Sequence, residues 1–228
     1  MTAAEIPHPG WVAPALLDEF PRLALSWTVV SRPGDRKLTG RSPGGVKERL
    51  RGVSNRMTGG RAVNMRQESV PAAYRIFFRQ IGIDPDVTRT PPEHAALERM
   101  RHGEFRSYGL IWDAVTIATV ETGVGVLPFD ADTVTGVPGL RLAAPGETLG
   151  QTELVEGEGA WPLSDGQMVL ADENGAMAVL FGRTAPEHEV TKESKRALLL
   201  AVRVGGVPDI TVEEALWLAA ELVEGRVP

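Results

Sequence analysis

Apolar residues along the chain recur with two different spacings, which predict both strands and helices. Leu23–Ser31 is an apolar, β-branched run between two prolines, as is typical of a strand. Across Val70–Ile81, apolar residues repeat at i, i+4, i+7, i+8 and i+11, the period of one helix face. Proline is tolerated in the first turn of a helix but not in its interior. Pro71 therefore places the start of this helix near Ser69.

Capping signals predict two further helices, and apolar periodicity predicts a third. Thr90-Pro91-Pro92-Glu93 has the form of a capping box and opens a helix that stops at Gly103. A second box, Thr211-Val212-Glu213-Glu214, opens a C-terminal helix that runs to Val223. Leu110–Thr122 is the third, closed by Gly123.

The remaining apolar runs are short and favour extended structure. Asp172-Glu173-Asn174-Gly175 separates two of them and is a strong hairpin signal. The expected extended segments are 126–129, 139–143, 168–171, 176–181 and 197–204. Strands without a βαβ rhythm predict an α+β fold, with mixed or antiparallel sheets flanked by helices.

The length of 228 residues suits a single domain, within which three parts can be distinguished. Residues 1–66 supply the first strand and then a Gly-, Arg- and Ser-rich segment, 32–66, which we expect to be loop around a short helix near 46–51. Residues 67–204 form the core of the domain, and residues 205–228 form the C-terminal helix.

Composition argues against disulfide-bonded, thiolate-metal and membrane-spanning proteins. The chain has no cysteine, so it has no disulfide and no thiolate metal site. No apolar run approaches the ~18 residues needed to span a bilayer, and the N-terminus lacks the pattern of a signal peptide. We therefore expect a cytoplasmic protein with no membrane partner.

Charge is distributed unevenly along the sequence. Residues 31–106 hold 16 Lys or Arg against 8 Asp or Glu, whereas residues 107–228 hold 7 against 19. A basic half is what an RNA-binding surface would require. Alternatively, the two signs intermingle on the folded surface.

Familiar catalytic motifs are missing or badly placed. Gly40-Arg41-Ser42-Pro43-Gly44 matches G-x-S-x-G, but the preceding strand ends about nine residues earlier and Pro43 has no N–H for an oxyanion hole. His94 and His102 lie eight residues apart, too far for a metal pair one turn apart. Glu187-His188-Glu189 is compact, but on an extended chain neighbouring side chains point to opposite sides. We expect neither a metal nor a cofactor.

Residues 112–147 carry the most specific pattern in the chain. Its pieces are Trp112-Asp113-Ala114-Val115-Thr116, Glu121-Thr122-Gly123, Pro128-Phe129-Asp130, Arg141, Ala143 and Gly146-Glu147. Asp84–Leu97 precedes them, and Val169–Asp172, Ala176–Gly182 and Glu189-Val190-Thr191 follow. In order and spacing, these pieces resemble the editing (B three/four, tRNA-binding) domain of the phenylalanyl-tRNA synthetase beta subunit. The resemblance runs from about Tyr74 to about Val204 and extends to small free-standing proteins made of this domain alone.

The resemblance implies a set of pocket positions. In this sequence they fall on Asp113, Val115, Thr116, Leu127, Asp130 and Glu189, or on Glu187 in place of Glu189 if the preceding loop is gapped differently. A threonine of the family falls on Val115 and a histidine falls on Leu127. We therefore expect a more apolar pocket, in a cleft bounded by Thr116, Leu127, Asp130 and Glu189. Alternatively, Asp113 bonds the backbone at the helix start and Asp130 caps a turn.

The resemblance also implies a reaction. The family domain hydrolyses wrongly charged aminoacyl-tRNA with a positioned water and no covalent nucleophile. The expected function is therefore trans-editing hydrolysis of a mischarged aminoacyl-tRNA or a related aminoacyl ester. The resemblance makes tRNA or aminoacyl-tRNA the expected partner, bound through basic residues 31–106, and no DNA is expected. Two alternatives stay open: an inactive module that binds RNA or an amino acid on the same fold, and a hydrolase that does not act on RNA. Arg141 and Glu147 are expected to be structural or to face RNA.

Overall fold

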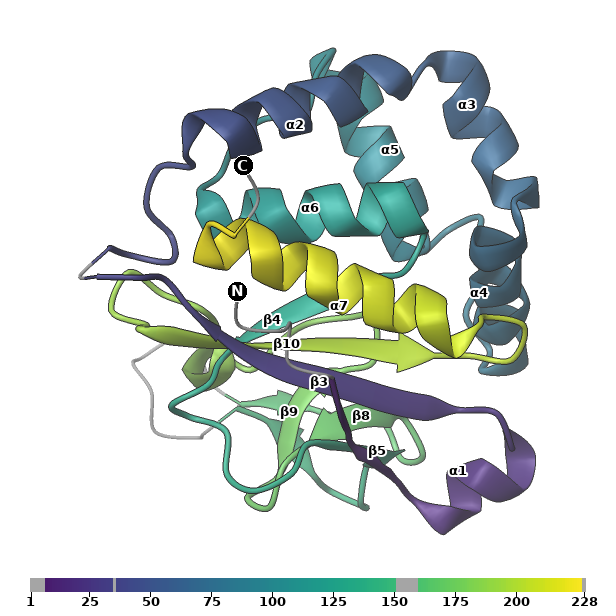
Figure 1. Cartoon of the computed structure of the whole chain (residues 1–228). Helices are drawn as coiled ribbons and strands as arrows, with labels where there is room; N and C mark the ends of the chain where they lie inside the picture. The colour runs from purple at the N-terminus through teal and green to yellow at the C-terminus, as the bar shows by residue number, and fades with distance from the viewer. Residues whose placement is uncertain (1–6, 35, 151–159, 227–228) are drawn as a thin grey trace.

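The molecule has three layers, with helices above a four-stranded sheet and a second sheet below it (Figure 1). The computed structural model describes residues 7–34, 36–150 and 160–226. Within these residues, no helix has both the length and the apolar character that crossing a membrane would require.

The upper sheet joins the two ends of the chain and is entirely antiparallel. Its strand order is β1-β3-β10-β4. The strands are β1 (His8–Pro9), β3 (Ala24–Ser31), β10 (Arg196–Arg203) and β4 (Val126–Asp130). The long β3 pairs with β10 along its whole length, from Ser31 opposite Arg196 to Ala24 opposite Arg203. A strand predicted near the N-terminus therefore lies at the centre of the molecule.

The lower sheet is mixed. Its order is β2-β5-β8-β9, in which β2 pairs with β5 in parallel and the other pairs are antiparallel. The strands are β2 (Trp11–Val12), β5 (Gly139–Leu142), β8 (Met168–Ala171) and β9 (Ala176–Val179), beside a two-stranded ribbon of β6 (Thr148–Leu149) and β7 (Trp161–Pro162). The predicted Asp172–Gly175 hairpin connects β8 to β9. An α+β fold with mixed and antiparallel sheets is confirmed.

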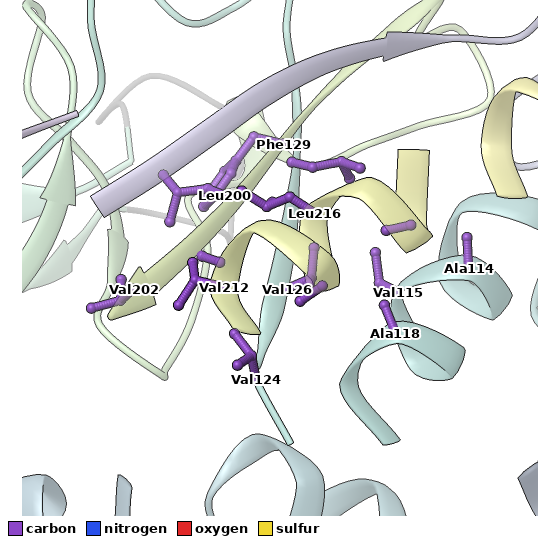
Figure 2. Packing of buried hydrophobic residues seen from close by; sticks show 14 of the residues in the cluster. Ala114, Val115, Ala118, Val124, Val126, Phe129, Leu200, Val202, Val212 and Leu216 are labelled. Atoms are coloured by element: carbon purple, nitrogen blue, oxygen red, sulfur yellow. The ribbon is translucent and has the colours of Figure 1, made fainter. Parts of the chain in front are cut away.

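Two helices cover the upper sheet and form the main core with it. These are α6 (Leu110–Thr122) and α7 (Asp209–Glu224), which pack against each other and against the sheet. Figure 2 shows part of this core, with Ala114 and Ala118 of α6, Leu216 of α7 and Leu200 of β10. The same buried cluster extends from Leu16 to Val223, so one core joins the N-terminal, central and C-terminal parts.

Residues 32–66 are far more helical than predicted. They contain α2 (Gly44–Arg56) and α3 (Gly59–Asn64), followed by a 3-10 turn (Met65–Gln67). The buried face of α2 carries Val46, Leu50 and Val53, the buried C-cap residue Met57 continues their helical spacing, and α2 packs along α6. The expectation of loop was wrong because four apolar residues at the right spacing decide the structure, despite the surrounding glycine and serine.

The predicted helix boundaries are confirmed where capping groups are present. Beside the short α1 (Pro14–Glu19), the chain forms α4 (Ser69–Gln80) and α5 (Pro91–His102). The Thr90–Glu93 capping box forms as predicted, and Gly103 ends α5 in the left-handed conformation. The second box does not form. Helix α7 begins three residues earlier, at Asp209 with Pro208 as its N-cap, and Asp209 supplies a negative charge in the first turn, where it stabilises the helix.

A buried ion pair ties α4 to α5. Arg75 donates one hydrogen bond to Glu93 Oε1 at 2.7 Å and another to Asp86 Oδ1 at 2.8 Å. The Arg75 and Glu93 side chains are 8% and 6% exposed. Glu93 also completes the capping box, through its Oε2, with Thr90. One carboxylate thus holds both the start of α5 and the position of α4.

Candidate functional site

Asp113 lies in the first turn of α6 and is 1% exposed. Its Oδ2 accepts hydrogen bonds from the hydroxyls of Ser42 at 2.6 Å and Ser107 at 2.5 Å. Its Oδ1 accepts the backbone N–H of Tyr108 at 3.0 Å. Three donors satisfy this buried carboxylate, which would otherwise be costly to bury. Asp113 therefore connects two loops to α6.

These bonds give Ser42 a structural role. Its residue is 4% exposed and its hydroxyl proton is used on Asp113. The preceding strand, β3, ends at Ser31, and Pro43 precedes α2 without an N–H to offer an oxyanion. The G-x-S-x-G match accordingly lacks the strand–turn–helix geometry of a nucleophile elbow, as the sequence indicated.

A cavity of about 250 Å³ lies between α5 and α6. Val115, which is 7% exposed, and the half-buried Thr116 line it from α6. Its other lining residues are Pro91, His94, Ala95, Glu98, His102, Glu104, Phe105, Arg106, Tyr108 and Thr119. The lining combines apolar groups with a few charged and hydroxyl groups, as small-molecule sites do.

One imidazole in this cavity is paired with a carboxylate. His102 Nε2 lies 3.3 Å from Glu98 Oε2, one turn earlier on α5. The Glu98 side chain also bonds Arg101, through its other oxygen, at 3.1 Å. A carboxylate beside an imidazole orients the ring. Glu98 and His102 thus form a candidate proton-accepting pair in the lining of the cavity, which also contains Val115 and Thr116.

Sequence reasoning missed this pair because it compared His94 only with His102. The useful signal was Glu98 four residues before His102, since i, i+4 side chains meet on a helix. Among the residues described, no group of three or more His, Asp or Glu side chains is arranged to hold a metal ion.

A second polar cluster lies where β4 ends. Asp130 Oδ2 accepts the Ser194 hydroxyl at 2.5 Å. The Thr133 hydroxyl donates to the Asp130 carbonyl at 2.9 Å and lies 2.9 Å from His188 Nδ1. Because the hydroxyl proton is already used, we infer that Nδ1–H of His188 is the donor. These partners are 55 and 64 residues apart, so no local sequence pattern indicated the cluster.

The Glu187-His188-Glu189 triplet is not extended, contrary to the sequence-based expectation. Pro186–His188 forms a 3-10 turn, which buries His188 to 8% exposure while Glu189 stays exposed. A compact turn lets consecutive side chains enter different environments, and the prediction assumed a strand. Glu187 Oε2 is buried beside this turn and has no hydrogen-bond partner among the described residues.

Burial lowers the pKa of His188, although Asp172, Glu187 and Asp130 oppose the shift. The folded protein therefore binds this proton less readily than the unfolded chain, whose histidine titrates near about 6.5. Stability should fall as pH drops through about 6.5 towards the lower folded pKa, by at most about 1.4 kcal/mol per pH unit for one proton.

We expect His188→Asn to flatten this fall, because asparagine keeps a donor for Thr133 without titrating. Urea unfolding at pH 7, 6 and 5 measures the difference in slope between the variant and the parent. Equal slopes over this range would show that His188 does not contribute.

The six positions taken from the family resemblance are divided among different places. Val115 and Thr116 line the α5–α6 cavity, and Asp113 lies in the same helix with its carboxylate on Ser42, Ser107 and Tyr108. Asp130 belongs to the cluster with Ser194.

The two remaining positions, Leu127 and Glu189, do not line this cavity. Leu127 pairs with Leu200 and Asp130 pairs with Ala197, and positions three apart on a strand face opposite sides of a sheet. Glu189 is exposed after the 3-10 turn. The α5–α6 cavity therefore includes Thr116 but not Leu127, Asp130 or Glu189. Arg141 and Glu147 form a short ion pair, with nitrogen–oxygen distances of 2.5 and 2.6 Å, which closes the turn after β5.

Comparisons with known proteins bear on the family to which the chain belongs. No curated protein matches the chain. Among solved structures, the chain is similar to an N-terminal fragment of the phenylalanyl-tRNA synthetase beta-subunit from Pyrococcus horikoshii, with 15% identity and a TM-score of 0.39. That match covers 50% of this chain and 38% of the fragment, so the chain spans well under half of its length.

A family model described as the B3/4 domain matches residues 73–207. The match includes most of α4 and all of α5, α6, both central strands of the lower sheet and β10, whereas β3, α2, α3 and α7 lie outside it. It spans more than half of the chain and confirms the resemblance predicted from the sequence. The chain belongs to the B3/4 domain family.

Proposed function

We propose that the protein is a trans-editing deacylase that hydrolyses the ester of a mischarged aminoacyl-tRNA, and that the α5–α6 cavity takes the aminoacyl group. The observation that carries the proposal is the cavity itself, with the family positions Val115 and Thr116 and the Glu98–His102 pair in its lining. At about 250 Å³ it is smaller than the ~300–1,000 Å³ of typical ligand sites, which suits a single amino acid.

The groups in the cavity match the needs of ester hydrolysis. His102, held by Glu98, accepts a proton from a water that attacks the ester carbonyl, and returns that proton to the ribose oxygen as the acyl C–O bond breaks. The Thr116 hydroxyl hydrogen-bonds to the ester or to that water. The carboxylates of Glu98 and Glu104 attract the free ammonium group of the amino acid. No covalent nucleophile is required, and Ser42 is not used.

The apolar part of the cavity determines which amino acid fits. Ala95, Phe105 and Val115 offer methyl groups and a ring, and Val115 stands where the resemblance places a threonine of the family. A site of this kind favours small apolar side chains and discriminates between them by only ~1–3 kcal/mol per methylene. Preferred substrates should therefore be tRNAs carrying small apolar amino acids, encountered in the cytoplasm.

The proposal predicts release of the amino acid from part of a panel of misacylated tRNAs. Purified protein is incubated with each member, and the remaining aminoacyl ester is measured over time against buffer. His102→Gln should lower the second-order rate constant by at least about 100-fold, the usual contribution of a general base. His8→Gln, on β1 beside Trp27, is the matched control and should keep the parent rate. Hydrolysis of no member above the buffer rate would contradict the function.

A second candidate is a binding module without turnover. Its support is that the Asp113 carboxylate is fully used by Ser42, Ser107 and Tyr108, while a leucine stands at the family histidine position. The same panel separates the two functions. Saturable binding of aminoacyl-tRNA with no loss of the ester would favour the binding module.

A further inference from the structure

Two loops that are distant in sequence run side by side next to the cavity. Ser42 and Ser107 share one oxygen of Asp113, and the Leu110 N–H donates to the Gly40 carbonyl at 2.9 Å. Gly109 has a φ of +114°, and a side chain there would collide with the Thr39 carbonyl. The backbone of residues 39–42 is therefore held against that of residues 107–110.

Helix α2 holds the second loop as well. The Ser54 hydroxyl accepts the N–H of Phe105 at 3.0 Å, and the Ser54 carbonyl accepts Nε of Arg99 at 3.1 Å. In Figure 1, α2 lies along the top of the helical layer beside α5 and α6. The two loops thus form a fixed surface, attached to α2 at one end and to Asp113 at the other.

Three large side chains project from this surface. Arg41 and Arg106 immediately precede the anchored Ser42 and Ser107, and both are exposed. Tyr108 is 66% exposed and, with Arg106, lines the α5–α6 cavity. The described residues provide no ion-pair partner for either arginine, and segments 38–47 and 105–112 contain no Asp or Glu. We name Arg41, Arg106 and Tyr108 the rim.

We propose that the rim binds the unpaired 3′-terminal nucleotides of an RNA, with a base stacked on Tyr108 and the phosphates on Arg41 and Arg106. The inference rests on the proposed function, because it places the ester-bearing end of the RNA at the mouth of the cavity.

The chemistry of the rim favours single-stranded RNA over other partners. An exposed aromatic ring stacks on the face of any unpaired base, whereas paired bases in a duplex are already stacked. Arginines without carboxylate partners are available to bind phosphate oxygens. The second loop is shared with the cavity through Arg106 and Tyr108, so one strand can occupy both. One support of the rim, the bond from the Phe105 N–H to Ser54, comes from α2, outside the residues matched by the family model.

Two sets of variants test the rim without disturbing the fold. Tyr108→Ala keeps the backbone N–H that Asp113 accepts. Arg41→Glu/Arg106→Glu changes exposed groups for which no ion pair is present among the described residues. Lys192→Glu/Lys195→Glu is the matched control, with the same charge change on the exposed segment before β10.

The probe is a fluorescein-labelled, non-acylated 12-nucleotide RNA, measured by anisotropy as a single strand and as a blunt duplex. We expect the single strand to bind more tightly than the duplex. Tyr108→Ala should weaken single-strand binding by about 10-fold, and Arg41→Glu/Arg106→Glu should do so by at least about 10-fold, with a shallower salt dependence. The control should change binding less than about twofold.

Equal loss in the control and rim variants would show a general charge effect and overturn the proposal, as would tighter binding of the duplex. A separate assay with a small aminoacyl ester of adenosine, which needs only the cavity, distinguishes the two proposals. Hydrolysis of this ester without RNA binding at the rim would contradict the rim alone. Binding of RNA at the rim with no hydrolysis of any ester would contradict the deacylase.

Discussion

Glu93→Ala should destabilise the protein by about 3 kcal/mol, because it leaves the buried Arg75 guanidinium with only the exposed Asp86 as a carboxylate partner. The variant also removes the side chain that completes the capping box of α5. Urea unfolding at neutral pH measures the change in the free energy of unfolding. The exposed pair between Arg101 and Glu98 provides the control, since Arg101→Ala should cost less than about 1 kcal/mol.

Replacing both members of the buried pair separates the two effects. Arg75→Met/Glu93→Met removes both charges together and should recover a large part of the stability lost in Glu93→Ala. This outcome would show that the unpaired charge, and not the lost packing, causes the damage. A cost for Glu93→Ala no greater than that for Arg101→Ala would contradict the role given to this pair.

Asp113→Ala should destabilise the protein by about 3 kcal/mol. A hydrogen bond to a carboxylate contributes ~1.5–3 kcal/mol, and donors that are exposed to solvent regain part of this loss by bonding to water. Ser42 is buried and cannot recover its bond, whereas Ser107 is exposed. Ser107→Ala should accordingly cost only about 1 kcal/mol. The same unfolding measurement compares the two variants.

Asp113→Ala should also disturb the positions of the rim residues. Without the carboxylate, the loop carrying Arg106 and Tyr108 is no longer held against the loop carrying Arg41. Single-strand RNA binding should weaken in Asp113→Ala, even at temperatures at which the variant is still folded. If Asp113→Ala lost no more free energy of unfolding than Ser107→Ala, Asp113 would not be what holds the two loops together.

Local patterns predicted the elements whose signals are local. The Thr90 capping box, the glycines after α5 and α6 and the hairpin between β8 and β9 each depend on a few adjacent residues. The start of α7 was predicted three residues late, because the capping-box pattern at Thr211 was followed although the helix begins after Pro208. Helix α2 was underestimated because composition was given more weight than the spacing of Val46, Leu50 and Val53.

The site depended on contacts that a single sequence does not contain. Ser42 meets Asp113 across 71 positions, and Asp130 meets Ser194 across 64. The family resemblance assigned Leu127 and Asp130 to one pocket. In the structure the two residues lie three positions apart on β4, so their side chains face opposite sides of the sheet. The separation of basic and acidic residues along the sequence is kept only in part on the folded surface. Arg49 and Arg56 pair with Glu121 of α6, so the two signs do intermingle there, whereas Arg41 and Arg106 stay exposed at the rim.

The most direct test of the deacylase is the initial rate of amino-acid release from the best misacylated tRNA, compared between the parent protein and His102→Gln at equal tRNA occupancy. The cavity and its Glu98–His102 pair predict a clear rate for the parent and a loss of at least about 100-fold in the variant, with binding of the tRNA retained. A parent rate equal to that of buffer, or a variant as fast as the parent, would contradict catalysis at this cavity.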